Sequence, residues 1–116
     1  MKKPIFYVCP ECDGMLQGTG EFEVKCCGNQ LEPLAVNKEN SNHEIDVSIV
    51  EDDFYITINH EMTKEHYISF ASYVGFDRVL TVNLYPEQDA VVRFPKMFRG
   101  KLYLYCNQHG LYEYTI

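Results

Sequence analysis

Along the second part of the chain, apolar side chains alternate with polar ones in short runs that turn residues separate. Alternation with a period of two is typical of strands that bury one face. The predicted strands are His43–Val50, Phe54–Ile58, His66–Val74, Arg78–Tyr85, Ala90–Phe94, Lys101–Cys106 and Leu111–Ile116. No segment shows an apolar stripe with the period and length of a helix. Seven strands in roughly 75 residues predict an all-β domain, an antiparallel sandwich.

The same alternation places all but one of the histidines, and the last cysteine, on apolar rows. Alternate positions group His43 with Ile45, Val47 and Ile49; His60 with Phe54, Ile56 and Ile58; His66 with Ile68 and Phe70; and Cys106 with Leu102 and Leu104. One histidine on such a row is usually a core residue. Several at strand ends, with His109 close to Cys106, are harder to explain in that way. We therefore expect these side chains to face the core side and to meet at one end of the sandwich.

Composition and charge limit the partners of this chain. It has 116 residues, 46% of them hydrophobic, which can fill a modest core. Ten Lys plus Arg against seventeen Asp plus Glu give a net charge of −7 without a basic run, which argues against a nucleic-acid or anionic-membrane partner. The N-terminus lacks an apolar segment of signal-peptide length, and no run of eighteen apolar residues occurs. We expect a cytoplasmic protein with no membrane partner.

Most of the cysteines lie near the start of the chain. They are Cys9, Cys12, Cys26 and Cys27. A C-x2-C turn can aim two thiolates at one ion, and a returning hairpin can bring the second pair to complete a tetrahedral four-sulfur site for zinc or iron. A short polar segment needs such a staple to fold. We expect a metal-binding domain at residues 1–36 and a sandwich domain at 37–116, with residues 35–42 as a polar linker.

The adjacent pair Cys26 and Cys27 is unusual for a zinc ribbon, which separates both of its pairs by two or more residues. Neighbouring side chains in extended backbone point apart, so an adjacent pair must be turned onto one ion. The pattern resembles desulforedoxin, a four-thiolate iron fold in which the gap between the pairs is usually slightly longer. The metal at this site is therefore iron or zinc.

Two later segments carry the histidines and the last cysteine in compact motifs: HEMTKEHYI begins at His60, and CNQHGLYEY begins at Cys106. They resemble the motifs H-P-M…E-H-Y-I and C-N-x-H-G-L-W of the superoxide reductase (desulfoferrodoxin) family. The cysteine knot, the linker, the first histidine and both motifs occur in the family's order, so the resemblance covers essentially the whole chain. It implies an immunoglobulin-like antiparallel sandwich of seven strands, preceded by a small desulforedoxin-like metal knot.

The resemblance also implies a catalytic metal site and its chemistry. Its nitrogen ligands would be His43, His60, His66 and His109, with Cys106 as the axial thiolate. These residues would hold an iron ion that gives one electron to superoxide, so that hydrogen peroxide forms and no dioxygen is made. An open sixth position and a small positive charge suit an anionic substrate. A rubredoxin-like electron donor and a homodimer are further expectations.

The chain departs from the family at positions that do not bind metal. The family's Glu-Lys before the first histidine is replaced by Ser41 and Asn42, the proline after the second histidine by Glu61, and a tryptophan by Tyr112. The missing lysine would attract superoxide or organise the water that protonates the product. Lys38 and Lys64 are candidate catalytic substitutes, although each is more often a solvated surface residue.

Three other functions remain open at this point. A non-catalytic protein on the same fold could transfer electrons or store iron. Alternatively, zinc at both sites would make a structural or interaction protein. A nucleophilic cysteine enzyme that uses Cys106 and His109 would leave three inward histidines unexplained.

Overall fold

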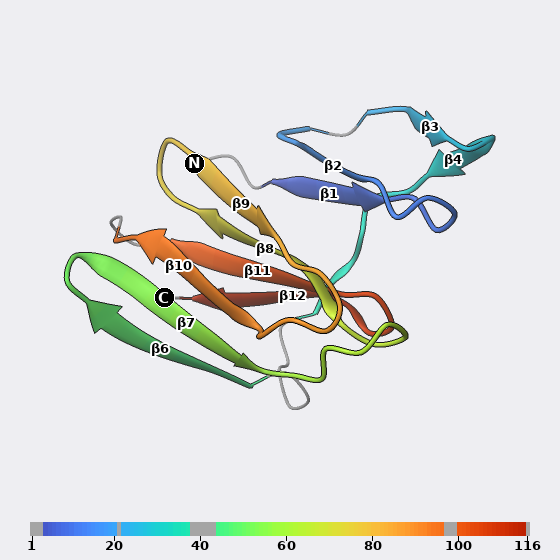
Figure 1. Ribbon diagram of the computed structural model, residues 1–116. Helices are drawn as coiled ribbons and strands as arrows, with labels where there is room; N and C mark the ends of the chain where they lie inside the picture. Colours follow the sequence, from blue (N-terminus) through green and yellow to red (C-terminus); the bar gives the residue numbers. More distant parts are fainter. Residues whose placement is uncertain (1–3, 21, 38–43, 97–99, 116) are drawn as a thin grey trace. The chain divides into compact units, whose positions relative to one another are not determined.

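The computed structural model describes residues 4–20, 22–37, 44–96 and 100–115, and they contain strands and turns but no helix. The described residues accordingly include no helix that is long and apolar enough to cross a membrane. The chain divides into two compact units, Met1–Ala35 and Val36–Ile116 (Figure 1).

The second unit is a β-sandwich of a three-stranded and a five-stranded sheet (Figure 1). The smaller sheet has the order β10 (Val91–Pro95), β7 (Asp53–Asn59), β6 (Glu44–Val50). The larger sheet has the order β5 (Val36–Asn37), β12 (Gly110–Thr115), β11 (Lys101–Cys106), β8 (Ile68–Val74), β9 (Val79–Asn83). All seven predicted strands are present with small shifts at their ends. The predicted fold class is therefore confirmed.

The hydrophobic core of this unit lies between the two sheets. The three-stranded sheet contributes Ile56, Ile58, Val92 and Phe94, and the five-stranded sheet contributes Ile68, Ala71, Tyr73, Leu102, Leu104, Cys106, Tyr112 and Tyr114. On β7 the burial alternates from Phe54 to Asn59, as period-two patterning requires. The core therefore extends to Cys106 at the end of β11.

One short strand departs from the sequence prediction. Val36 and Asn37, inside the predicted linker, form β5, which pairs in parallel with β12. A strand of two residues is too short to show any alternation, so the pattern could not reveal it. Residues 38–42 of the predicted linker lie outside the described residues.

The edge strand β6 is less buried than its pattern predicts. Ile45 and Val47 pair with core residues of β7, so they face the core side. Ile45 packs against the core, but Val47 is 39% exposed and Ile49 is 58% exposed. The reason is that β6 ends the order of the smaller sheet, with one paired neighbour among the described strands.

Strand β8 contains one extra residue where it pairs with the end of β11. Cys106 pairs with Ile68 and the register shifts at this point, so Ser69 forms a β-bulge. Ile68 belongs to the core. The ring of Phe70 instead stacks on the ring of Tyr105 of β11, on the face of the sheet that points away from this core. Our prediction that His66, Ile68 and Phe70 share one face is therefore wrong for Phe70.

The first unit consists of two small hairpins. Strand β1 (Ile5–Val8) pairs with β2 (Met15–Gly18), and β3 (Val24–Cys26) pairs with β4 (Asn29–Leu31). Its buried cluster is small and consists of Tyr7, Cys9 and Leu31. A core of this size contributes little to the free energy of folding, which is why a unit of this kind usually needs a bound metal or a disulfide.

Candidate metal centres

The four cysteines of the first unit form a cluster that can hold a metal ion. Their sulfur atoms all lie within 4.8 Å of one another. Cys12 Sγ is 3.5 Å from Cys26 Sγ, which is 3.7 Å from Cys27 Sγ. A tetrahedral ion with metal–sulfur bonds of about 2.3 Å requires sulfur separations of about 3.8 Å. The four thiols therefore fit one zinc or iron ion.

A tight turn brings the adjacent cysteines to the same point. Cys26 pairs with Asn29, so Cys27 and Gly28 are the two loop residues of the β3–β4 hairpin. Their φ angles are +53° and +81°. Positive φ at both loop residues is the mark of a type I′ turn, in which the first position favours asparagine and the second favours glycine. The left-handed conformation of Cys27 turns its sulfur toward that of Cys26.

The first pair is held by its own loop. The Cys9 amide donates to the Gly14 carbonyl, and the Asp13 amide donates to the Cys9 carbonyl, both at 2.9 Å. The crowded thiols differ in acidity. A backbone hydrogen bond from Cys12 is the largest cause that lowers the pKa of Cys9 to about 7. Hydrogen bonding with the Cys12 sulfur, in contrast, is the largest cause that raises the pKa of Cys26 to about 12, so Cys26 resists ionisation. A bound cation would offset this cost, so metal binding and thiol ionisation are coupled.

Replacing Cys27 by asparagine distinguishes its role in the turn from its role as a metal ligand. Asparagine suits the first position of a type I′ turn but supplies no sulfur. We expect Cys27→Asn to lose the metal of the first unit and to unfold that unit, while the sandwich stays folded. Metal analysis and near-ultraviolet circular dichroism measure both effects. Gln30→Asn, on the same hairpin, is the control, and full metal retention in Cys27→Asn would contradict the assignment.

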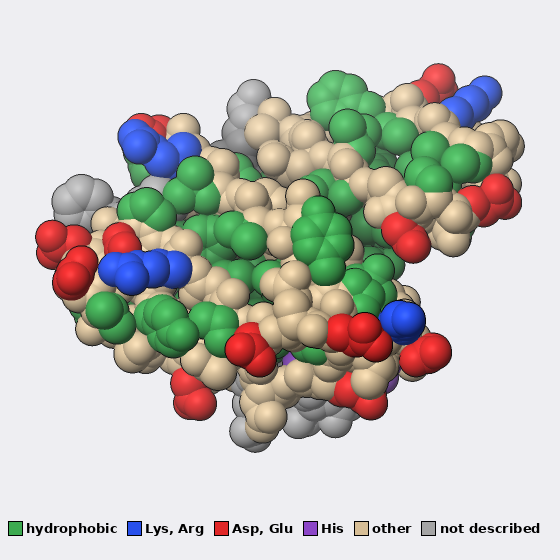
Figure 2. Space-filling model, viewed as in Figure 1, with side chains coloured by type: hydrophobic (Ala, Val, Ile, Leu, Met, Phe, Trp, Pro, Cys, Tyr) green, Lys and Arg blue, Asp and Glu red, His purple; other side chains and the backbone are tan. Residues whose placement is uncertain are grey.

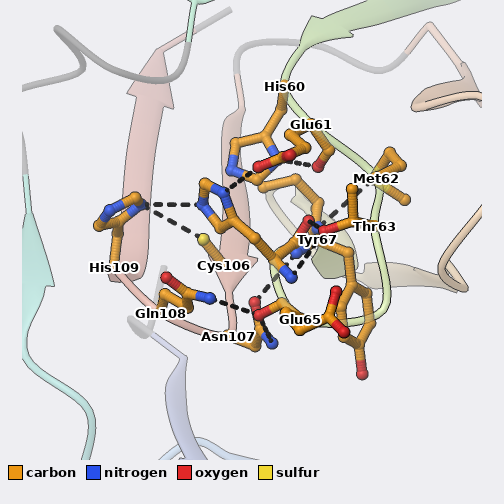
Figure 3. A network of polar contacts seen from close by, with 12 residues as sticks. His60, Glu61, Met62, Thr63, Glu65, Tyr67, Cys106, Asn107, Gln108 and His109 are labelled. Atoms are coloured by element: carbon orange, nitrogen blue, oxygen red, sulfur yellow. Dashed lines mark hydrogen bonds and ion pairs between the residues drawn. The ribbon is translucent and has the colours of Figure 1, made fainter.

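A second cluster lies at one end of the sandwich. His60 follows β7, His66 precedes β8, Cys106 ends β11 and His109 precedes β12 (Figure 3). Their ligand atoms all lie within 4.8 Å of one another. Ligands about 2.0–2.3 Å from one ion lie up to about 4.6 Å apart, so separations of this size need only small shifts to bind one ion. Three imidazoles and one thiolate therefore have the size and the chemistry of a transition-metal site.

Hydrogen bonds indicate which nitrogen of each imidazole faces the cluster. His60 Nδ1 donates to the Glu61 carbonyl, and His66 Nδ1 donates to the Glu61 carboxylate at 2.8 Å (Figure 3). Both Nε2 atoms are then available to a metal. His109 presents Nδ1 instead, 3.2 Å from His66 Nε2 and 3.5 Å from Cys106 Sγ. The cluster therefore offers two Nε2 atoms, one Nδ1 atom and one sulfur.

A short turn fixes the position of His66. Thr63 and His66 exchange backbone hydrogen bonds in both directions, at 3.0 and 3.3 Å. The Thr63 hydroxyl also accepts from the His66 amide at 3.1 Å. The Met62 sulfur accepts from the Ile68 amide at 3.4 Å, and the Met62 carbonyl accepts from the Glu87 amide at 2.7 Å. The loop between His60 and β8 is therefore anchored at several points.

Asn107 joins the two loops that carry the cluster. Its Nδ2 donates to the Glu65 carbonyl at 3.0 Å, and its Oδ1 accepts from the Tyr67 amide at 3.0 Å (Figure 3). Its own amide donates to the Tyr67 carbonyl at 3.2 Å. Gln108 Nε2 donates to the same Glu65 carbonyl. The residues on either side of His66 are thus tied to the turn between Cys106 and His109.

Burial sets the protonation of the two least exposed ligands. Burial lowers the pKa of His60 from its ordinary value, so the imidazole is neutral near pH 7. Burial also raises the pKa of the Cys106 thiol, while the backbone amides of Gln108 and His109 act in the opposite direction. The thiol therefore needs a cation beside it to ionise fully, and the two amides stabilise the thiolate that forms.

Comparisons with known proteins identify relatives by sequence and by fold. No protein-family model matches the chain. The chain is 27% identical over 114 residues to the desulfoferrodoxin of Clostridium acetobutylicum. The match covers 88% of this chain and 86% of the relative. Together with the two ligand motifs, this match supports the superoxide reductase and desulfoferrodoxin family for this chain.

Solved structures of this family share the fold. The superoxide reductase of Treponema pallidum matches with a TM-score of 0.84 and 20% identity, over 98% of this chain and 99% of its own. A one-iron superoxide reductase of Giardia intestinalis matches with a TM-score of 0.52 and 20% identity, over 62% of this chain and 93% of its own. At such low identity these likenesses support the fold alone.

The structure does not place every residue that the sequence singled out. His43 and Lys38 lie outside the described residues, as do Ser41 and Asn42 at the positions of the family's Glu-Lys. Their roles stay predictions. Lys64 is exposed on the loop between His60 and His66, and its role also stays a prediction.

Two residues at the site were not recognised from the sequence. Glu61 was noted only as a departure from the family's proline, and Asn107 only as a letter of a motif. A carboxylate or an amide close to a predicted histidine ligand is the signal that could have found them, because such groups commonly orient metal-binding imidazoles.

Removing the Asn107 side chain should loosen the second cluster. We expect Asn107→Ala to lower the metal affinity of the His/Cys site by about tenfold or more, because loss of a supporting hydrogen bond displaces His66 relative to Cys106. Competition with a chelator measures this affinity. Asn83→Ala, at an exposed position at the end of β9, is the matched control. Equal affinities of the two variants would show that Asn107 does not hold the site.

Proposed function

We propose that this protein reduces superoxide to hydrogen peroxide at an iron ion in the second cluster. Its ligands would be His60, His66, Cys106 and His109, with His43 as the fifth. The observation that carries the proposal is the meeting of three imidazoles and one thiol at one end of the sandwich. The family's superoxide reductases support the choice of reaction.

The reaction balances with one electron and two protons. An iron ion in this site would supply the electron, passing from the ferrous to the ferric state. One superoxide anion, that electron and two protons from solvent give one hydrogen peroxide, and no dioxygen is made. A reductant then has to restore the ferrous state, and a rubredoxin-like protein is the proposed donor.

The exposure of the ligands suits a small substrate. Cys106 is fully buried, whereas His109 is exposed. The sulfur is therefore shielded on the core side, and solvent reaches the imidazole side, where an anion could enter and peroxide could leave. Buried sulfur with two amides beside it also sets how strongly the thiolate donates to the iron.

The surface charge does not favour an anionic substrate. Figure 2 shows acidic side chains spread over the visible face and only small areas of histidine. With a net charge of −7, the protein repels superoxide at long range. Attraction then has to come from the iron site itself and from nearby lysines, which is why Lys64 keeps its proposed catalytic role.

The four-cysteine cluster would hold a second iron ion, or zinc. With iron it could store or relay an electron, and with zinc it would act only in folding. A homodimer in the cytoplasm, without a nucleic-acid or membrane partner, completes the proposal. Non-catalytic electron transfer and a structural zinc protein are the alternatives.

Superoxide consumption tests the proposed reaction. We expect anaerobically purified, iron-loaded protein to remove superoxide faster than buffer in stopped-flow or pulse-radiolysis measurements, with one peroxide formed for each superoxide. Cys106→Ser should lower the rate constant by at least about tenfold, because it removes the thiolate that stabilises the site. Zinc-loaded protein is the inactive control. Superoxide decay no faster than in buffer would contradict the proposal.

Lys64 can be tested in the same measurement. We expect Lys64→Gln to lower the rate constant by about threefold and to weaken its dependence on ionic strength, since it removes a positive charge from the loop between two ligands. Lys96→Gln removes the same charge beyond Pro95, which pairs with Asp53 at the start of β7, far from His60. Equal rates for both variants would exclude a special role for Lys64.

A further inference from the structure

Glu61 contacts two of the clustered imidazoles in two different ways. Its backbone carbonyl accepts from His60 Nδ1, and its carboxylate accepts from His66 Nδ1 at 2.8 Å (Figure 3). A carboxylate only accepts hydrogen bonds, so the proton of His66 must lie on Nδ1. One residue therefore fixes the tautomer of both histidines and turns both Nε2 atoms toward the cluster.

The two contacts differ in what they require of the side chain. Any residue at this position supplies the carbonyl for His60, including the proline that the family's motif carries there. The carboxylate for His66 depends on glutamate. The backbone contact is thus general, and the side-chain contact is a property of this chain.

We propose that Glu61 is a positioning residue that strengthens His66 as a metal ligand and favours the ferric state of the bound iron. This inference rests on the proposed iron site. A carboxylate that accepts the Nδ1 proton makes the imidazole a stronger donor through Nε2. It also adds a negative charge next to the cluster, which stabilises the ion with the higher charge.

The exposure of the pair limits the size of this effect. The Glu61 side chain is 57% exposed, and that of His66 is 21% exposed. Solvent screens a carboxylate this open, so the effect should lie at the low end of the range for outer-shell partners of metal ligands. We expect a loss of metal affinity of about tenfold when the carboxylate is removed.

Glu61→Gln tests the inference because glutamine keeps the shape and can still accept from His66 through its amide oxygen. Affinity for zinc is measured by chelator competition on metal-free protein, and the iron midpoint potential by redox titration. We expect about tenfold weaker zinc binding at the His/Cys site. If the loss of the carboxylate weakens ferric binding about tenfold more than ferrous binding, the iron midpoint potential rises by about 59 mV. Glu61→Pro should behave in the same way, because it keeps the carbonyl.

Glu65→Gln is the matched control, since it removes a carboxylate from the residue just before His66. If it changes affinity and potential as much as Glu61→Gln does, net charge alone acts and the inference is wrong. Unchanged values in Glu61→Gln would also overturn it. Neither readout uses superoxide, and zinc affinity does not depend on iron. A protein without turnover therefore refutes the proposed function while the role of Glu61 is still decided.

Discussion

The β-bulge at Ser69 is the constraint on which the geometry of the second cluster depends. Side chains alternate along a strand, so Ile68 and Phe70, two residues apart, would point to the same face if β8 had no extra residue. That face is turned away from the core, and the chain would enter β8 from His66 on the wrong side. The bulge reverses this parity, and Ile68 then pairs with Cys106 on the core side. Bulges often occur beside functional sites because they redirect a side chain in this way.

Hydrogen bonds between loops at the strand ends, which the two sheets bring together, hold the rest of the site. His60 directly follows a strand of the smaller sheet, whereas Cys106 ends a strand of the larger one. Packing of the core fixes the distance between the sheets but not the orientation of the loops. Asn107 and Glu61 supply that orientation through hydrogen bonds to the segments that carry His66 and His60. Ligand geometry here depends on groups that need not touch the metal.

Alternation along the chain was sufficient to predict the seven strands and the meeting of His60, His66 and Cys106 at one end of the sandwich. It could not reveal β5, because two residues show no period, nor the bulge, because β8 carries buried side chains on both faces and shows no clear alternation that an extra residue would interrupt. The expected inward row of His66, Ile68 and Phe70 failed for this reason. Hydrogen bonds such as that from Asn107 to Glu65 join residues far apart in sequence and have no periodic signal.

The two clusters solve the same problem by opposite means. In the first unit a local turn with positive φ at Cys27 brings neighbouring sulfurs together, so the chain needs little core to form the site. In the sandwich, ligands from separate strands meet because a large core holds those strands in place. The first unit should therefore depend on its metal for folding, whereas the sandwich can form its site before a metal binds. Metal removal should accordingly affect the folding of the first unit more than that of the second.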